Sequence, residues 1–526
     1  MEQTQNTTDL IKTLLISSLL CLWFYWIWAR RSFYQFAIKF PGCFGSPVIG
    51  SFGTIKNFKS ILQAFGILFE RCKSNTICVW MGFYPTVVSS DPEFIEKILS
   101  STELLNKAKI LYNPVYQAFQ GGIISSPASV WQHNRKMINP SFHHKVLVSF
   151  LPVFHKGKNV LLSKLNEMVD NGEFKLSDII QRVTLGISVE TTMGKIMGPG
   201  DQVEEEVIGN FRFAMDKIVH HIMISCVNLG PLYSLYFKYQ SVKKRIHQFV
   251  FELVQEKLKR MSKETENPTE EDENSMESIK KCPNIFIDQA IEIYQKQKFS
   301  FNDIIVESNN IVTASFETTG NGILSVLVML AIHPDVQERL YDEIVNIFPE
   351  KDFEMEYEHL EQLPYLDMVI NETLRLAPSI PAIGRHVTKD IQLSKDLVLP
   401  KDMQVIMSIF HVHRRKDIWG PNANSFDPDN FLPENMAGKH PYAYIPFSKG
   451  MRNCIGWRYA IFAMKVILVG IVRNYRLTTT TKYEDIDFIY NIALKYLNEP
   501  SFETSWRFMD NRQEAVVAPV NLILSS

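Results

Sequence analysis

One cysteine, held in a glycine-containing turn, constrains this chain more than any other feature. Residues 447–456 read FSKGMRNCIG, and a largely apolar run, residues 460–472, follows soon after. Gly450 and Gly456 lack a Cβ, so the backbone around Cys454 can adopt conformations and close approaches that other residues forbid. The sulfur can therefore point out of the turn, where a thiolate can ligate a metal ion. For a lone cysteine, a place in the core is the commoner alternative.

This turn resembles the cysteine loop of the cytochrome P-450 family, in which phenylalanine, glycine, arginine, cysteine and glycine recur at this spacing. The matching residues are Phe447, Gly450, Arg452, Cys454 and Gly456. The resemblance implies that Cys454 is the axial ligand of a haem b iron and that its electron donation favours cleavage of dioxygen. It further implies that Phe447 lies against the sulfur and that Arg452 contacts a haem propionate.

The length and composition agree with an ordinary globular protein and argue against several other classes. A chain of 526 residues suggests about three domains by length alone. The resemblance implies one haem domain of the cytochrome P-450 fold instead, mainly α with a small β-rich lobe (α+β). A net charge of -2, without a basic stripe, gives no reason to expect a nucleic-acid partner. Seven cysteines without CxxC or Cys/His spacing fit neither a disulfide framework nor a zinc site.

The N-terminus predicts a membrane anchor. Residues 13–29 carry no charge and are closed by Arg30 and Arg31, which is the short end of a membrane span. The arginines place the following chain on the cytoplasmic side. We therefore expect an N-terminal transmembrane helix in residues 1–31, a basic and Pro/Gly-rich hinge in 32–50, and the catalytic domain in 51–526. Within that domain, about 263–278 is acidic and predicts an exposed, mobile linker.

Two further motifs extend the resemblance on the cofactor side. Trp131 and Arg135 stand four residues apart and so share one face of a helix. On their own they indicate an arginine stacked on a surface tryptophan. The family has the same WxxxR pair, which implies that both side chains hold a haem propionate. Arg385 is expected to meet a propionate as well, and the residues before it are expected to contact substrate.

A long helix is predicted from Ser300 to about residue 333, with Asp303 as the capping-box partner of Ser300. Ala314 and Thr318 lie one turn apart within it, and Thr318 can donate to the carbonyl of Ala314, which loosens that turn. In the family an acidic residue and a threonine at this place deliver protons during oxygen activation. The resemblance assigns those roles to Glu317 and Thr318. A solvent-facing carboxylate is the alternative for Glu317.

Two residues of this helix depart from the family pattern. Ser315 stands where glycine is usual, and we expect it to narrow the groove beside the haem. Ala314 stands where the fatty-acid ω-hydroxylase branch often has a glutamate that esterifies the haem. We therefore predict that the haem is not covalently esterified at Ala314.

A buried ion pair is expected below the haem. Glu372 and Arg375 are three residues apart on one helix face, a spacing that in most proteins indicates a weak surface pair. In the family this ExxR pair is buried and is joined by a second arginine. Asn430 replaces that arginine here, so we expect backbone carbonyls to complete the arrangement. At the C-terminal end, residues 477–524 predict a hairpin whose tip, near 499–502, reaches into the substrate chamber.

These observations predict a haem-thiolate monooxygenase acting on an apolar substrate. The chain has no GxGxxG fingerprint for a nucleotide, so electrons must come from a partner. The resemblance implies the NADPH-cytochrome P-450 reductase of the endoplasmic reticulum membrane, with cytochrome b5 as a further candidate. The sequence looks most like insect relatives of the fatty-acid ω-hydroxylases. Three alternatives remain open: an enzyme of this fold that rearranges peroxides, a haem protein that senses a ligand, and a degenerate, haem-free membrane scaffold.

Overall fold

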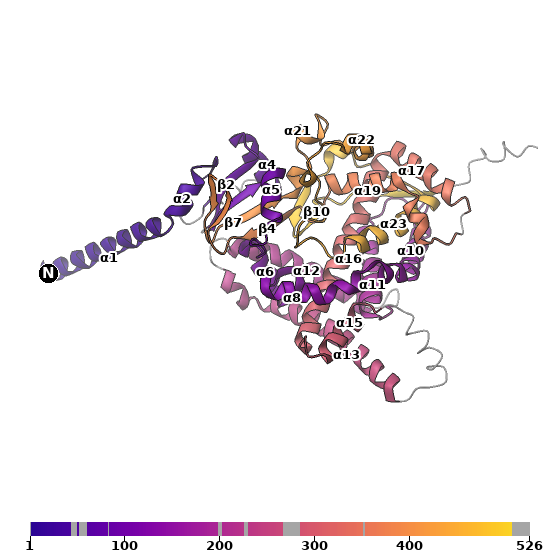
Figure 1. Ribbon diagram of the computed structural model, residues 1–526, viewed down its shortest axis with the longest axis horizontal. Coiled ribbons are helices and arrows are strands. Elements are labelled where there is room, and N and C mark those ends of the chain that lie inside the picture. Colours follow the sequence, from indigo (N-terminus) through magenta and orange to yellow (C-terminus); the bar gives the residue numbers. More distant parts are fainter. Residues whose placement is uncertain are drawn as a thin grey trace, which may run out of the picture.

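The computed structural model describes residues 2–43, 50–51, 60–82, 84–197, 202–225, 230–266, 284–350 and 353–507. Helices dominate and a small sheet lobe lies toward the N-terminal helix (Figure 1), which confirms the predicted fold class. The expected acidic linker lies outside the described residues apart from its first four positions, which end a helix. Part of the expected hinge, 44–49, also lies outside them.

The helices have the following bounds: α1 Glu2–Ala29, α2 Arg31–Ala37, α4 Ile61–Cys72, α5 Pro92–Leu99, α6 Lys109–Phe119, α7 Gly122–Ser125, α8 Ala128–Ile138, α9 His144–Ser149, α10 Leu151–Asn166, α11 Ser177–Met193, α12 Gln202–Ser225, α13 Phe237–Glu266, α15 Phe286–Gln295, α16 Phe301–Ile332, α17 Pro334–Ile347, α18 Tyr357–Glu361, α19 Pro364–Leu376, α20 Ile409–Val412, α21 Lys416–Trp419, α22 Pro433–Met436 and α23 Trp457–Asn474. Short 3-10 helices are Asn139–Phe142, Gly230–Leu235, Pro428–Phe431, Pro441–Ala443 and Tyr483–Asp485.

A five-stranded sheet forms the β-rich lobe. Its order is β1-β2-β3-β7-β4, with bounds β1 Gly42–Cys43, β2 Thr76–Met81, β3 Tyr84–Ser89, β4 Ala382–His386 and β7 Gln404–Ser408. Strands β2 and β3 pair antiparallel, and every residue of β2 is buried. Ile77 and Val79 face the main core, whereas Trp80 packs with Phe33 and Phe36 of α2.

Helix α16 runs through the middle of the molecule and packs against α11, α13, α19 and α23. Its predicted start is confirmed, because Ser300 and Asp303 form a capping box in which Asp303 N donates to Ser300 Oγ at 3.1 Å. Most of its side chains are buried. Helix α16 therefore lies at the centre of the core.

The remaining strands are β5 Ile391–Ser394, β6 Leu397–Leu399, β8 Tyr475–Thr478, β9 Phe488–Asn491, β10 Ala493–Tyr496 and β11 Glu503–Trp506. The predicted hairpin exists as β9 and β10, but its expected tip near 499–502 is wrong. The turn that reaches the cavity is at Ile492. Glu499 instead accepts hydrogen bonds from Ser177 N (2.9 Å) and Ser177 Oγ (2.6 Å) at the start of α11, where a carboxylate is stabilised by the helix dipole. Pro500 has no N–H to continue a strand.

Helix α1 extends away from the rest of the molecule (Figure 1). Its segment Leu10–Ala29 is exposed and is long and apolar enough to cross a membrane. Helix α16 meets the same length and composition criteria, but it is mostly buried within the protein. Only α1 therefore has the features of an anchor among the described helices.

Candidate functional site

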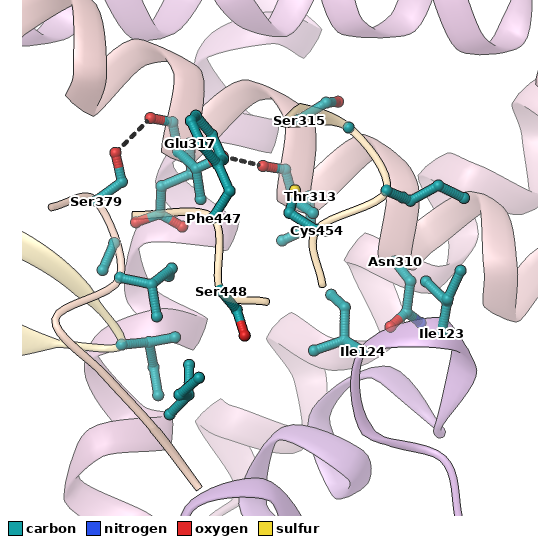
Figure 2. A pocket seen from close by; sticks show the side chains of 18 of the residues that line it. Ile123, Ile124, Asn310, Thr313, Ser315, Glu317, Ser379, Phe447, Ser448 and Cys454 are labelled. Atoms are coloured by element: carbon teal, nitrogen blue, oxygen red, sulfur yellow. Dashed lines mark hydrogen bonds between the residues drawn. The ribbon is translucent and has the colours of Figure 1, made fainter. Parts of the chain in front are cut away.

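A cavity of about 320 Å³ lies between α16, the 447–456 turn and the start of α6. Its walls are mainly apolar, and they include Ile380, Ala382 and Ile383, which the sequence predicted as substrate contacts. Helix α12 adds Met215 and Ile218. Figure 2 shows labelled side chains of α7, of α16 and of the 447–456 turn around one space.

The cysteine turn is held by backbone contacts that only glycine allows. Gly450 has φ +74°, and a Cβ at this residue would lie 2.0 Å from the carbonyl oxygen of Leu99. Cys454 N donates to Phe447 O at 3.0 Å and so closes the turn. Gly456 caps α23. The side chain of Cys454 is accessible from the cavity, which is the outward orientation that the sequence predicted.

The surroundings of Cys454 act on its protonation in opposite directions. Burial raises the pKa of the Cys454 thiol, while a hydrogen bond from the backbone of Gly456 and the positive charges of Arg135 and Lys107 lower it. A metal ligand must be the thiolate. The N–H group and the two cations stabilise that form of the sulfur.

Opposite the cysteine, α16 presents a loosened turn. Thr318 Oγ1 donates to Ala314 O at 2.6 Å, as predicted, and Ser379 Oγ donates to Thr318 O at 3.0 Å. Ser315, expected to narrow the groove, donates from its hydroxyl to Val312 O at 3.2 Å and also bonds Ser188 of α11. The Ser315 hydroxyl is thus engaged by helix backbone and α11.

Glu317 lines the same cavity but is not the solvent-facing carboxylate that was the alternative. Only 9% of its side chain is exposed, and one oxygen lies 3.6 Å from Lys495 Nζ of β10. Burial raises the pKa of Glu317, and the charge of Lys495 opposes that shift. Among the residues of α12, Asp216 also raises the pKa of Glu317 and Arg212 lowers it. A buried carboxyl group with a raised pKa therefore lies one residue from Thr318.

Lys107 and Arg452 line the cavity, Arg385 lies close to both, and none of these three cations has a carboxylate partner anywhere in the described chain. Arg385 is 1% exposed and Arg452 6%. Arg452 donates to Leu105 O (3.0 Å) and Ser126 O (2.7 Å), but its Nη1 is buried and without a partner among the described residues. Burial lowers the pKa of Arg452 to about 9. Cations held this way require anions that the protein itself does not supply.

Lys107 is the functional candidate that sequence reasoning missed. A single lysine before a helix indicates a solvated residue, yet this one faces the cavity with its Nζ 4.6 Å from the centre of the Tyr112 ring. Its apolar neighbours Leu104 and Leu105 were the only local signal. Its proximity to Arg385 and Arg452 depends on contacts between distant segments.

Trp131 and Arg135, predicted to act as a pair, contact different residues of the cysteine turn. Both residues line the cavity from α8. The guanidinium of Arg452 lies 4.4 Å over the Trp131 ring. Arg135 donates to Asn453 O (2.9 Å) and Asn453 Oδ1 (3.1 Å), beside the cysteine. The indole and the two guanidinium groups therefore tie α8 to the cysteine turn.

Glu372 and Arg375 form a buried pair with no exposed side-chain surface. Arg375 donates through Nε to Glu372 Oε2 and through Nη2 to Oε1, each at 2.7 Å. It also donates to three backbone carbonyls, those of His413, Ala423 and Ser425. Asn430 Nδ2 donates to Glu372 Oε1 at 3.1 Å. The Asn430 amide thus donates to Glu372 where the family has a second arginine, and backbone carbonyls accept the remaining hydrogen bonds of Arg375.

Comparison with known proteins identifies the family to which the chain belongs. The family model for Cytochrome P450 matches residues 41–498. This chain belongs to the cytochrome P450 family. It is 36% identical to "Probable cytochrome P450 313a4" of Drosophila melanogaster over 501 residues, covering 94% of this chain and 99% of that protein. It is 30% identical to "Cytochrome P450 4c21" of Blattella germanica, covering 88% and 91%. The suspected insect relatives are thereby confirmed.

Members of the P450 family bind haem b through a cysteine thiolate, and this P450 has residues that fit the cofactor. Cys454 faces a large apolar cavity. Arg452 Nη1, which has no partner among the described residues, and Arg385 and Lys107, which have no carboxylate partner there, offer positive charge for two carboxylates. The chain is therefore a haem-thiolate oxidoreductase of the monooxygenase type, with a small-molecule substrate and a redox partner.

Proposed function

We propose that this P450 is anchored in a membrane by α1 and inserts one atom of dioxygen into an apolar organic molecule. The bond attacked is a carbon-hydrogen bond or a carbon-carbon double bond, and the candidate substrates are lipid-like, hormone-like or foreign compounds. The observation that carries this proposal is the placement of Cys454, Glu317 and Thr318 around one mainly apolar cavity.

In this proposal the turn of residues 447–456 holds the cofactor from one side. Cys454 would supply the thiolate ligand, and haem b would supply the chemistry of oxygen activation when it is bound. Gly450 and Gly456 keep the turn in the conformation that exposes the sulfur, and Phe447 shields it. Ala314 offers no carboxylate, so no ester to the haem is expected.

The acidic edge of the cofactor would be bound by the cations that have no carboxylate partner in the described chain. Arg385, Arg452 and Lys107 provide the charge, and Trp131 and Arg135 fix the position of the arginines and of the cysteine turn. Glu372, Arg375 and Asn430 would stabilise the fold around this part of the cofactor site.

Glu317 and Thr318 are the proposed proton-handling residues. Glu317 can hold a proton because burial raises its pKa, and the hydroxyl of Thr318 borders the cavity one position along α16. A proton held at Glu317 Oε and passed toward Thr318 Oγ1 would reach oxygen without opening the apolar walls to bulk water.

Electrons are proposed to come from NADPH-cytochrome P-450 reductase, with cytochrome b5 as a second donor. The apolar and exposed segment Leu10–Ala29, followed by Arg30 and Arg31, supports an endoplasmic reticulum location with residues 51–526 facing the cytosol.

A carbon monoxide difference spectrum tests the proposed ligand. The full chain with its anchor is expressed, reduced under carbon monoxide and compared with Cys454→Ser and with Cys21→Ser, which alters an exposed thiol in α1. We expect the strongly red-shifted Soret band of thiolate-ligated haem in the wild type and in Cys21→Ser, and its loss in Cys454→Ser. A wild type that binds no haem would refute the enzyme in favour of a scaffold.

Turnover with purified reductase separates the remaining alternatives. A monooxygenase consumes NADPH and oxygen when substrate and reductase are present. An enzyme that rearranges peroxides forms its product without reductase, and a ligand sensor forms a stable oxygen complex and no product. Either of the last two results would contradict the proposal.

A further inference from the structure

One polar side chain interrupts the apolar wall of the chamber between α16 and α7. Asn310 of α16 is fully buried and lies among Ile123, Ile124 and Ile311. Figure 2 shows Asn310 between Ile123 and Ile124 with its amide oxygen turned toward Ile124. A buried amide in such surroundings needs a reason, because unsatisfied polar groups are costly.

The orientation of this amide follows from its neighbours. Asn310 Nδ2 donates to Val306 O at 2.8 Å, and a carbonyl can accept only from the nitrogen end. The oxygen is therefore the free end. Asn310 Oδ1 is buried and accepts no hydrogen bond from any residue that the structure describes.

The nearby donors are already committed elsewhere. Ile123 N donates to Glu307 Oε2 at 2.9 Å, and Asn134 Nδ2 donates to Glu307 Oε1 at 2.5 Å. Gly122 lies so close that a Cβ there would be 2.2 Å from Asn310 Nδ2, and its φ is +74°. The backbone thus packs tightly against the amide without satisfying its oxygen.

We infer that Asn310 Oδ1 is the polar anchor of the substrate chamber and accepts a hydrogen bond from a hydroxyl or N–H group of an otherwise apolar molecule. This inference rests on the proposed function, whose substrate class it narrows. Asn310 and its neighbours Glu307 and Asn134 bring no positive charge, so this end of the chamber suits a neutral donor and disfavours a carboxylate.

The position of the anchor also limits where the molecule is oxidised. Ala314 and Thr318 follow Asn310 by one and two helical turns, which places them ~6 and ~12 Å further along the axis of α16. A substrate held at Asn310 therefore presents a carbon at about that distance from its donor group.

Matched ligands test the anchor. The full chain is loaded with haem and titrated with decan-1-ol, with 1-methoxynonane, which has the same number of heavy atoms but no donor, and with decanoate. Binding is measured by equilibrium dialysis and by the shift of the Soret band. One neutral hydrogen bond predicts that the alcohol binds about five-fold more tightly than the ether, and that decanoate binds more weakly than the alcohol.

The variant Asn310→Leu should abolish the preference for the alcohol while leaving ether binding within about two-fold. Asn310→Ala is the second variant, in case leucine does not fit. Asn321→Leu is the matched control, because Asn321 lies on the same helix with an unpaired buried amide nitrogen but is not part of the chamber wall. Asn321→Leu should keep the preference.

Two results would overturn the inference: an unchanged alcohol preference in both Asn310 variants, as expected if an ordered water satisfies the oxygen, or decanoate binding as tightly as the alcohol in the wild type. Failure of the proposed function is separate from both. It appears as a missing carbon monoxide band, and dialysis of the purified chain still measures the preference for the alcohol.

Discussion

The place of Asn430 beside Glu372 allows a quantitative test of how this P450 manages without a second arginine. Glu372 Oε1 accepts from Arg375 Nη2 (2.7 Å), Asp427 N (2.9 Å) and Asn430 Nδ2 (3.1 Å). Asn430→Ala removes one hydrogen bond to an ionised group, and two donors remain. We expect a loss of about 1–2 kcal/mol of folding free energy, since such bonds contribute about 1.5–3 kcal/mol when no other donor substitutes.

Asn430→Asp has nearly the same shape but should cost more. A second carboxylate 3.1 Å from Glu372 Oε1 would repel it by about 5 kcal/mol at an effective dielectric constant of about 20. The aspartate can escape by taking up a proton, which at pH 7 costs about 4 kcal/mol from an ordinary pKa of about 3.9. The penalty is thus at most about 4 kcal/mol and shrinks as the pH falls.

The assay is the rate at which the thiolate-haem carbon monoxide band is lost at fixed temperature, with wild type, Asn430→Ala and Asn430→Asp side by side. Asn435→Ala is the control, because Asn435 is an exposed neighbour whose amide bonds only Asp429 O among the described residues. We expect the band to be lost fastest in Asn430→Asp, more slowly in Asn430→Ala and most slowly in the wild type. The control Asn435→Ala should lose it at the wild-type rate. Equal rates for Asn430→Ala and wild type, or for Asp and Ala, would refute the role given to Asn430.

Two further outcomes follow from buried carboxyl groups. Burial raises the pKa of Glu307 to about 7, above its unfolded value of about 4.5; the folded state therefore holds the proton more tightly, and folding stability should fall by up to ~3 kcal/mol as the pH rises from about 4.5 to about 7. Urea midpoints should show this slope in the wild type and not in Glu307→Gln, and an equal slope in both would contradict it. Lys495→Met removes the charge that lowers the pKa of Glu317, so the limb of the pH-rate profile that reports Glu317 should move to higher pH. Lys389→Met, which breaks an exposed pair with Glu103, is the control, and an unmoved limb in Lys495→Met would argue against the contact.

Local patterns were enough to predict the elements that depend on local chemistry. The capping box of Ser300 and Asp303, three residues apart, predicts the start of α16, and the four-residue spacing of Ala314 and Thr318 predicts the bond between them. The glycines around Cys454 indicate a turn that exposes the sulfur. In each case the residues that determine the geometry lie within one or two turns of each other.

Other features depend on contacts between distant segments, and the sequence did not show them. Lys107 becomes part of the site only because the sheet brings Arg385 and the cysteine turn alongside it. The stacking of Arg452 on Trp131 joins the cysteine turn to α8, two segments that no sequence spacing relates. The hairpin tip was placed wrongly because alternation of apolar residues does not reveal that the strands turn at Ile492, or that Glu499 caps α11.

The hydrogen bond from Arg452 to Ser126 spans 326 positions of the chain, and it has a consequence for biosynthesis. The segments that carry Lys107, Trp131 and Arg135 leave the ribosome long before the cysteine that they surround. Until residue 456 has emerged, the early part of the domain exposes apolar surface and unpaired cations with nothing to enclose. Cofactor insertion therefore has to wait until residue 456 has emerged, and until then the unfinished domain is a substrate for chaperones.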